Sequence, residues 1–475
     1  MIVSLLRMNI RHAPALAFAL AFAAVMSAAV PDQRPNILFI ITDDQRADLL
    51  GLAGHPVAKT PHIDRVGREG AWFRNFFTVT PLCSPSRASF LTGLYPHSHN
   101  VINNDKLGLD VISHTLFTWP RQLREAGYET AFIGKWHMGL DDSRRPGFDR
   151  WVSFKGQGIY IDGVVNEDGV SRQLTGYMTD YLNEQAVAFI AQPRTRPFAL
   201  VLSHKAVHIP YLPATRHEPL YADHTFEPAP PIPGDRAGKP ILTRPVPPVD
   251  RHALEGVAPE PAEPRRNRGR DPASIVRDQL RCLASVDEGV GQLLAALERS
   301  GELDRTVIVY TSDNGYLMGE HGVIDQKRVA YEPSLRVPLV VRYPPAIPAG
   351  TVRDQMVLNI DLAPTLLDFA GVKSVIPLHG RSFAPLLRDD SAAWRTAFLA
   401  EYFLEKVGPR FPTWQAIRTT RWKYIRYTAE PEEYEELYDL QTDPDEEQNL
   451  IATATGRTQV PALRRELEEL LRATR

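Results

Sequence analysis

The chain has 475 residues, of which 43% are hydrophobic and 23% are charged, and its formal net charge is −3 at neutral pH. This length suits either about two or three ordinary domains or one large domain with a small annex, and the composition is that of a globular protein. The small negative net charge argues against nucleic acid or an anionic membrane surface as a partner.

The first thirty residues predict an export signal. Arg7 and Arg11 precede an almost wholly apolar run from Ala13 to Val30, and small residues at 27–29 offer a cleavage site. An uncleaved membrane anchor is the alternative, but the run is short and alanine-rich for a spanning helix. We therefore expect residues 1–29 to be a cleaved signal peptide and the mature protein to be periplasmic or secreted.

Four apolar runs rich in β-branched residues predict buried strands at 36–42, 128–133, 198–203 and 306–311. Their lack of strict alternation is typical of strands that are buried on both faces of a parallel sheet. Helical patterns lie between them, for example at 115–127 and 275–300. We therefore expect an α/β fold in which helices flank a large, mostly parallel central sheet.

Polar residues follow each predicted strand directly: Asp43 and Asp44, then Lys135 and His137, then His204 and His208, then Asp313 and Asn314. Ligand sites in open α/β sheets form beyond the carboxyl ends of the strands, so these residues predict one shared site. Carboxylate and amide oxygens favour Ca²⁺ or Mg²⁺ over a thiophilic metal. Turn capping is the alternative for each pair of acidic residues taken alone.

Cys83 lies at the start of a predicted helix, because Ser84 is a good N-cap and Pro85 suits the first turn. The amino end of a helix attracts anions, and Arg87 lies on the same helical face as Cys83. Together with a cation and Lys135, these groups predict a pocket for a tetrahedral oxyanion, either sulfate or phosphate. A thiolate is a candidate nucleophile because its pKa would fall there, but a soft thiolate matches a hard cation poorly.

Three other parts of the chain carry expectations of their own. Cys282 lies in an amphipathic helical pattern, which favours a buried free thiol over a disulfide. The proline-rich stretch 225–272 predicts an irregular insertion that either shapes substrate access or is a solvated excursion. Paired strands with a turn near Thr420, followed by a charged terminal helix, predict a small α+β domain at 396–475 and leave 30–395 as the catalytic domain.

The stretch "CSPSRASFLTG" resembles the C-x-P-S-R signature of the formylglycine-dependent (type I) sulfatases. Further stretches are similar to blocks of that family, in the same order: "NILFIITDDQRADLLG", "TPHIDRVGREGAWFRNFF", "GYETAFIGKWHMG", "YTSDNGYLMGEHG" and "DQKRVAYEPSLRVPLVVR". The resemblance implies an alkaline-phosphatase-like fold. It also implies that a formylglycine-generating enzyme oxidises Cys83 to formylglycine, whose hydrated gem-diol attacks sulfur.

The resemblance further implies a role for each residue of the site. The ligands of one Ca²⁺ would be Asp43, Asp44, Asp313, Asn314 and the modified Cys83. Four other residues would act on the diol or the sulfate group: Arg87, Lys135, His137 and Lys327. His208 would protonate the leaving oxygen, with His204 as the alternative proton donor, and otherwise as a residue that faces the substrate or is only a structural neighbour. His321 would line the pocket or support its loop.

The stretches 325–342 and 412–427 look most like sulfatases that act on N-acetylglucosamine 6-sulfate and related glycosaminoglycan sugars, so a sulfated carbohydrate is the expected substrate. Three alternatives stay open: an arylsulfatase for small aryl sulfates, a phosphonate monoester or phosphodiester hydrolase of the same fold, and a non-catalytic binder of sulfated glycans. The sequence does not determine the sugar, the sulfate position or the oligomeric state.

Overall fold

The structure is a computed structural model that describes residues 33–105, 108–226, 236, 238–243, 271–406, 411–428 and 434–475. The predicted signal peptide lies outside these residues, as does most of the predicted insertion at 225–272. Among the described residues, no helix combines the length and the apolar character needed to cross a membrane.

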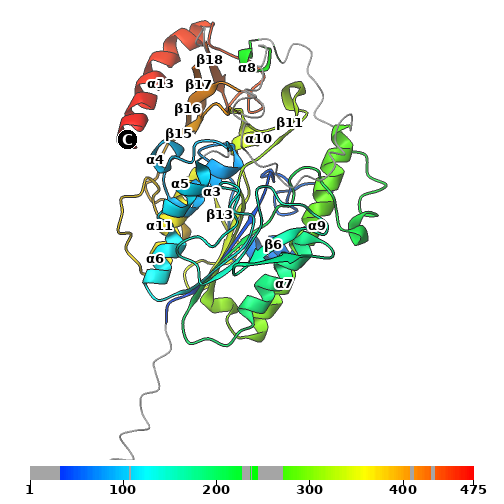
Figure 1. The fold of residues 1–475 in the computed structure, drawn as a ribbon. Coiled ribbons are helices and arrows are strands. Elements are labelled where there is room, and N and C mark those ends of the chain that lie inside the picture. Colours follow the sequence, from blue (N-terminus) through cyan, green and yellow to red (C-terminus); the bar gives the residue numbers. More distant parts are fainter. Residues whose placement is uncertain are drawn as a thin grey trace, which may run out of the picture. The chain divides into compact units, whose positions relative to one another are not determined.

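A ten-stranded sheet runs through the middle of the fold (Figure 1). In spatial order its strands are β13 (Thr351–Arg353), β2 (Ala71–Phe73), β12 (Leu339–Arg342), β9 (Thr306–Ser312), β1 (Asn36–Thr42), β8 (Phe198–Ser203), β4 (Glu129–Gly134), β5 (Arg150–Ser153), β6 (Val164–Glu167) and β7 (Val170–Gln173). Strand β1 pairs in parallel with β8 and β9, and β4 pairs in parallel with β8. The expectation of a mostly parallel central sheet is confirmed, and the four predicted strands are its middle members.

Helices cover both faces of this sheet because the side chains of its strands alternate between two cores. Phe39 of β1 belongs to one core, with α3 (Cys83–Thr92), α6 (Trp119–Glu125), α11 (Leu362–Phe369) and α12 (Ala384–Arg388). Leu38 belongs to the other core, with α2 (Pro61–Arg68), α7 (Met178–Ile190) and α9 (Pro272–Arg299). Figure 1 shows α6 and α11 on the side of the sheet opposite α7 and α9. The apolar residues of β1 therefore alternate between the two helix layers.

Two predicted helices are confirmed, but their first residues differ from the prediction. Helix α6 begins at Trp119 and not at 115, because the Thr118 hydroxyl accepts from the Arg121 N–H and caps the helix there. Helix α9 begins earlier than predicted, at Pro272, because the Asp271 carboxylate accepts from the Ser274 N–H. In both cases a side-chain cap decides where the helix starts.

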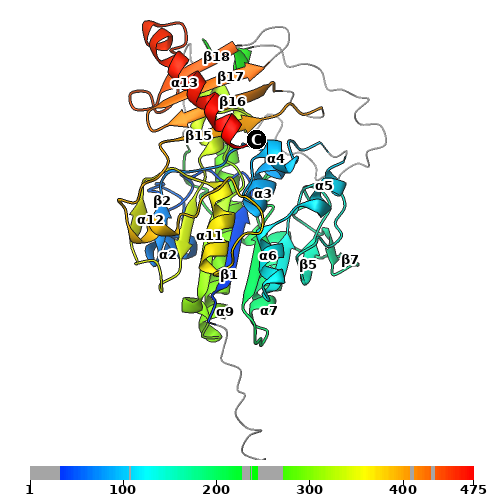
Figure 2. The same ribbon diagram turned by 90° about the vertical axis from the view of Figure 1, so that its left-hand side faces the viewer.

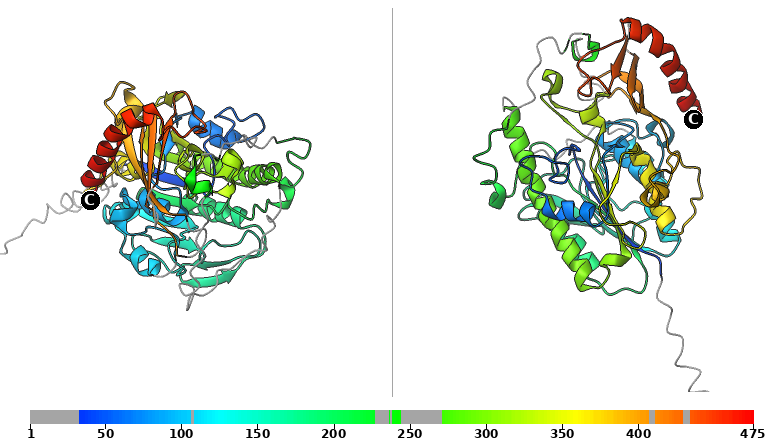
Figure 3. Two further views of the ribbon diagram at one scale, coloured as in Figure 1. Left: turned by 90° about the horizontal axis from the view of Figure 1, so that it is seen from above. Right: turned by 180° about the vertical axis from the view of Figure 1, so that it is seen from behind.

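The chain ends in a second sheet, which is antiparallel and has the order β15 (Ala397–Tyr402), β16 (Thr413–Thr419), β17 (Trp422–Thr428) and β18 (Tyr434–Asp439). Helix α13 (Ala454–Ala473) lies along it (Figures 2 and 3). The predicted turn near Thr420 is confirmed, since β16 and β17 pair with Arg418 opposite Lys423. Leu82 packs in the core of this sheet, directly before Cys83.

Shorter elements complete the fold. They are β3 (Phe76–Phe77) with β14 (Val357–Leu358), β10 (Leu317–Met318) with β11 (Ile324–Gln326), and the helices α4 (Pro96–His99), α5 (Leu109–Thr115), α8 (Pro240–Thr243) and α10 (Glu332–Leu335). The strand pair β10–β11 leads to Lys327, so this small hairpin carries a predicted site residue.

Candidate active site

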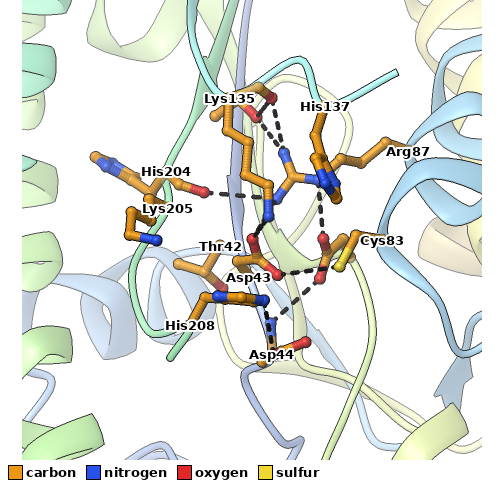
Figure 4. Close-up of polar contacts among 12 residues, drawn as sticks. Thr42, Asp43, Asp44, Cys83, Arg87, Lys135, His137, His204, Lys205 and His208 are labelled. Carbon is orange, nitrogen blue, oxygen red and sulfur yellow. Dashed lines mark hydrogen bonds and ion pairs between the residues drawn. The ribbon is translucent and has the colours of Figure 1, made fainter. Parts of the chain in front are cut away.

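The carboxyl ends of β1, β4, β8 and β9 meet at one edge of the sheet, where the predicted polar residues gather (Figure 4). The backbone joins two of these loops directly. The Asp43 N–H donates to the Ala206 carbonyl at 2.9 Å, and the Val207 N–H donates to the Asp43 carbonyl at 2.9 Å. Asp43 and Asp44 are fully buried, and Asp44 has a left-handed φ of 61°. The site is therefore built on paired backbone that constrains its side chains.

Helix α3 presents Cys83 and Arg87 to this edge, although its start differs from the prediction. The N-cap is Leu82 in extended conformation, and the Ser84 hydroxyl donates to the His137 carbonyl and not to its own helix. The expectation that Ser84 caps the helix was wrong, because a partner distant in sequence takes its hydroxyl. The bond instead ties the start of α3 to the loop that follows β4.

Arg87 contacts residues at the carboxyl ends of all four central strands. Its Nε donates to the Asp313 carboxylate at 2.8 Å, and its Nη2 lies 3.5 Å from an Asp43 carboxylate oxygen. Its Nη1 donates to the Lys135 carbonyl at 2.9 Å and also to the Ser203 hydroxyl. A buried guanidinium with this many acceptors is held rigidly, so one positive charge has a fixed place beside the carboxylates.

Two buried lysines approach the adjacent carboxylates of Asp43 and Asp44 from different loops. The Lys135 ammonium donates to Asp43 and to the side-chain oxygen of Gln157. The Lys327 ammonium donates to Asp44 and lies 2.7 Å from the Cys83 sulfur. Position 83 is thus next to a fixed cation and 3.6 Å from an Asp43 carboxylate oxygen.

The acidic residues carry the signature of a cation site. Ligand atoms of Asp43, Asp44 and Asp313 all lie within 4.8 Å of one another. Burial, reinforced by the like charges of Asp43 and Asp313, raises the pKa of Asp44 to about 7 despite the opposing effect of Lys327. Burial and Asp43 also raise the pKa of Asp313. Burial alone would raise the pKa of Asp43, but Lys135 holds it well below its usual range. Asp44 and Asp313, which resist ionisation, are carboxylates that a bound cation would stabilise.

Two oxygen atoms of this cluster have no hydrogen-bond partner among the described residues: Asp44 Oδ2 and Asn314 Oδ1. Both atoms are buried, and leaving a buried acceptor unsatisfied is costly. Hard oxygen donors that are free for a ligand fit Ca²⁺ or Mg²⁺. The residues present therefore suit the divalent cation that the sequence predicted.

The Cys83 thiol does not behave as predicted. Burial, followed by the negative charge of Asp43, raises its pKa to about 12, although Lys327 and Lys135 act in the opposite direction. The expectation that the amino end of the helix would lower this pKa was wrong, because loss of hydration outweighs the favourable charges. Both Cys83 and Cys282 are free and buried, as expected for Cys282, so they form no disulfide.

The structure separates the four predicted histidines. His137 lies with its Nδ1 3.4 Å from the Ser84 hydroxyl, and His208 lies with its Nε2 3.7 Å from an Asp44 oxygen. The ring of His204 points away from the carboxylates (Figure 4), and only its carbonyl oxygen meets the site, at 3.5 Å from Arg87. The ring of His321 packs against Tyr331, with 4.5 Å between the ring centroids.

Two contacts of the site had escaped the sequence reasoning. The Ser203 hydroxyl accepts from Arg87 and donates to the Lys135 carbonyl at 2.7 Å. Ser203 ends a predicted strand, so the rule that found the neighbouring polar residues could have found it too. Gln157 meets Lys135 from the loop after β5, where no local pattern marks it.

Comparison with known proteins adds independent findings. The sulfatase family matches residues 35–372, and the C-terminal part of N-sulphoglucosamine sulphohydrolase matches residues 319–473. An N-acetylglucosamine-6-O-sulfatase of Bacteroides thetaiotaomicron is 33% identical, over 93% of this chain and 86% of that protein. The human N-acetylglucosamine-6-sulfatase is 31% identical, over 90% of this chain and 83% of its own length.

A solved structure of a protein in complex with its substrate D-glucosamine-2-N,6-O-disulfate superposes with a TM-score of 0.81. It is 32% identical in sequence, and the match covers 92% of this chain and 97% of that one. The likeness spans both the ten-stranded sheet and the C-terminal sheet.

Proposed function

Because the chain belongs to the sulfatase family and is a sulfuric ester hydrolase, we propose that its substrate is a glycan carrying a 6-O-sulfated N-acetylglucosamine or related glucosamine residue. The relatives that act on such sugars resemble the chain over most of its length, which supports this substrate class. One observation carries the site assignment. The buried position 83 lies between the Lys327 ammonium, at 2.7 Å, and an Asp43 carboxylate oxygen, at 3.6 Å.

A Ca²⁺ ion would be held by oxygen atoms of Asp43, Asp44, Asp313 and Asn314, together with the modified residue 83. When bound, this cation offsets negative charge on the sulfate group. The two orphaned oxygen atoms, Asp44 Oδ2 and Asn314 Oδ1, support it. The clustered carboxylates support it as well.

The proposal also includes conversion of Cys83 to formylglycine by a formylglycine-generating enzyme. The hydrated aldehyde supplies a hydroxyl nucleophile that an unmodified thiol would not. The stretch "CSPSR" supports this conversion. A thiol whose pKa is raised to about 12 stays protonated at neutral pH, which argues against an unmodified thiolate as the nucleophile.

The remaining site residues have separate roles around position 83. Lys135, Lys327 and Arg87 hold fixed positive charges that stabilise the sulfate oxygens as charge develops on them. His137 lies beside the start of α3, where it can exchange a proton with residue 83. His208 directs Nε2 toward the cluster and delivers a proton to the departing sugar oxygen.

We further propose that residues 1–29 direct export and are removed, as their basic flank and apolar run suggest. We keep residues 30–395 as the catalytic domain and 396–475 as the C-terminal subdomain. Leu82 lies in the core of the second sheet, which supports a structural role for that subdomain in holding Cys83.

The test is sulfate release from a panel of esters by protein made in a host that forms formylglycine. The panel contains N-acetylglucosamine 6-sulfate, sulfated galactose and N-acetylgalactosamine, an aryl sulfate and an aryl phosphate. Cys83→Ala serves as the inactive variant, and Cys282→Ala is the matched control because it alters the other buried free cysteine.

We expect turnover of the 6-sulfated glucosamine by the wild type and by Cys282→Ala, and none by Cys83→Ala. Turnover that persists in Cys83→Ala would contradict the assigned nucleophile. Cleavage of the phosphate alone would replace the proposal with the phosphoester hydrolase, and cleavage of the aryl sulfate alone would replace it with the arylsulfatase.

A further inference from the structure

Tyr160 lies behind the loop that carries His208. Its side chain is fully buried, and its hydroxyl donates to the His208 carbonyl at 2.7 Å. Its ring stacks on Tyr177, with 5.9 Å between the centroids, and the Lys205 ammonium lies 5.0 Å from the ring centroid. The Tyr160 phenol thus contacts the backbone of the proposed proton donor.

The orientation of the His208 ring depends on this backbone. Its Nδ1 lies 2.8 Å from the Ile209 carbonyl, which only accepts, so Nδ1 carries one proton in that bond, and Nε2 can donate only when it carries the second proton of the imidazolium. The other nitrogen, Nε2, is thereby directed toward Asp44. The Lys205 ammonium donates to the same Ile209 carbonyl at 3.3 Å. A shift of the peptide between residues 208 and 209 would therefore move Nε2.

The loop is anchored on both sides. Asp43 holds Ala206 and Val207 through two backbone hydrogen bonds, and Tyr160 holds the carbonyl of His208 itself. Without the Tyr160 hydroxyl, this carbonyl still accepts from the Tyr211 N–H at 3.3 Å, within the part of the chain that the structure describes. Loss of the hydroxyl therefore need not unfold the loop, but it removes the shorter of the two bonds that fix its position.

We propose that Tyr160 is a positioning residue for His208 and that it aims Nε2 at the oxygen of the departing alcohol. The inference rests on the proposed function, in which His208 is the proton donor. It assigns Tyr160 no contact with the substrate. The effect of Tyr160 on the rate must therefore depend on how strongly the leaving group needs a proton.

Tyr160→Phe tests the inference, and Tyr177→Phe is its matched control. Both substitutions remove one phenol hydroxyl from the same stacked pair, but the Tyr177 hydroxyl donates to the Leu212 carbonyl, at 3.0 Å. Each variant is assayed on a 6-sulfated glucosamine, whose alcohol leaves poorly, and on an aryl sulfate with an acidic phenol, which leaves without help.

We expect Tyr160→Phe to lower kcat on the sugar sulfate by about tenfold or more, within the range that general acid catalysis contributes, and on the aryl sulfate less than about twofold. Tyr177→Phe should leave both rates unchanged. Retained turnover of the aryl sulfate shows that the variant is folded. A Tyr160→Phe variant that loses as much kcat on the aryl sulfate as on the sugar sulfate would overturn the inference. A Tyr177→Phe variant with the same losses as Tyr160→Phe would overturn it as well.

Two reference results separate this inference from the proposed function. If the wild type releases sulfate from neither ester, the proposed function itself fails. If the wild type is active but His208→Asn lowers both rates equally, His208 is not the proton donor and the role of Tyr160 fails with it. If His208→Asn loses turnover selectively on the sugar sulfate but Tyr160→Phe does not, the positioning role of Tyr160 is refuted while His208 remains the proton donor.

Discussion

Asp44→Asn should make the metal-free protein more stable at neutral pH, although it removes a proposed ligand. Burial and neighbouring carboxylates raise the pKa of Asp44 from 3.8 to about 7. A raised carboxyl pKa favours the protonated group in the folded state, so its stabilising contribution is present below pH 3.8 and is lost as pH rises through about 7. Each pH unit in this window lowers the free energy of unfolding by about 1.4 kcal/mol. The ionised Asp44 therefore lowers it by on the order of 4 kcal/mol at pH 7 and above.

The assay is thermal and denaturant unfolding between pH 4.5 and pH 8.5, with a chelator and with Ca²⁺. In the chelator, wild-type stability should fall as pH rises toward 7, and Asp44→Asn should lack most of that fall. Added Ca²⁺ should stabilise the wild type far more than the variant, because ligand binding to the folded state adds to stability.

Asp48→Asn is the matched control for this experiment. The Asp48 side chain is half exposed, and against the opposing effect of desolvation its ion pair with Arg46 lowers its pKa. This variant should lose stability at neutral pH and keep the Ca²⁺ effect. A wild type whose metal-free stability is flat between pH 4.5 and 8.5, or an Asp44→Asn variant that gains as much from Ca²⁺ as the wild type, would refute the reasoning.

Two further predictions concern other charged contacts. Lys327→Met removes the ammonium that lies 2.7 Å from the Cys83 sulfur, and kcat/KM for sulfate esters should fall by about 100-fold or more; a loss below about threefold would contradict its role. The His97 Nδ1 lies 2.9 Å from a Glu401 carboxylate oxygen, and its Nε2 lies 2.9 Å from the Thr474 carbonyl oxygen. Both nitrogens therefore donate, and the ring is an imidazolium. Burial alone would lower the pKa of His97, but Glu401 raises it. The contribution of the charged His97 ring to folding stability is therefore complete below pH 6.5 and is lost as pH rises through the raised pKa. His97→Gln should flatten the dependence of melting temperature on pH between 5.5 and 8, and an unchanged slope would count against the imidazolium.

The local pattern of the chain was sufficient to predict the central strands and the polar residues that follow them. Strands such as 36–42 and 198–203 have the predicted bounds, because a buried strand needs a continuous apolar run and ends where polar residues begin. Helix ends were less accurate. The start of α6 depends on the Thr118 cap, and the Ser84 hydroxyl donates to a residue distant in sequence.

By itself, the sequence determined the order of the strands along the chain, the residue types at their ends and the unusual setting of Cys83. Only the tertiary structure decided how these groups meet. Lys327, which lies 244 residues beyond Cys83, reaches its sulfur, and the His208 ring turns toward the carboxylates while the His204 ring turns away. Burial also reversed the expected direction of the thiol pKa. The physical reason is that hydration and the distance between charges depend on the packing of segments far apart in sequence, which no local pattern encodes.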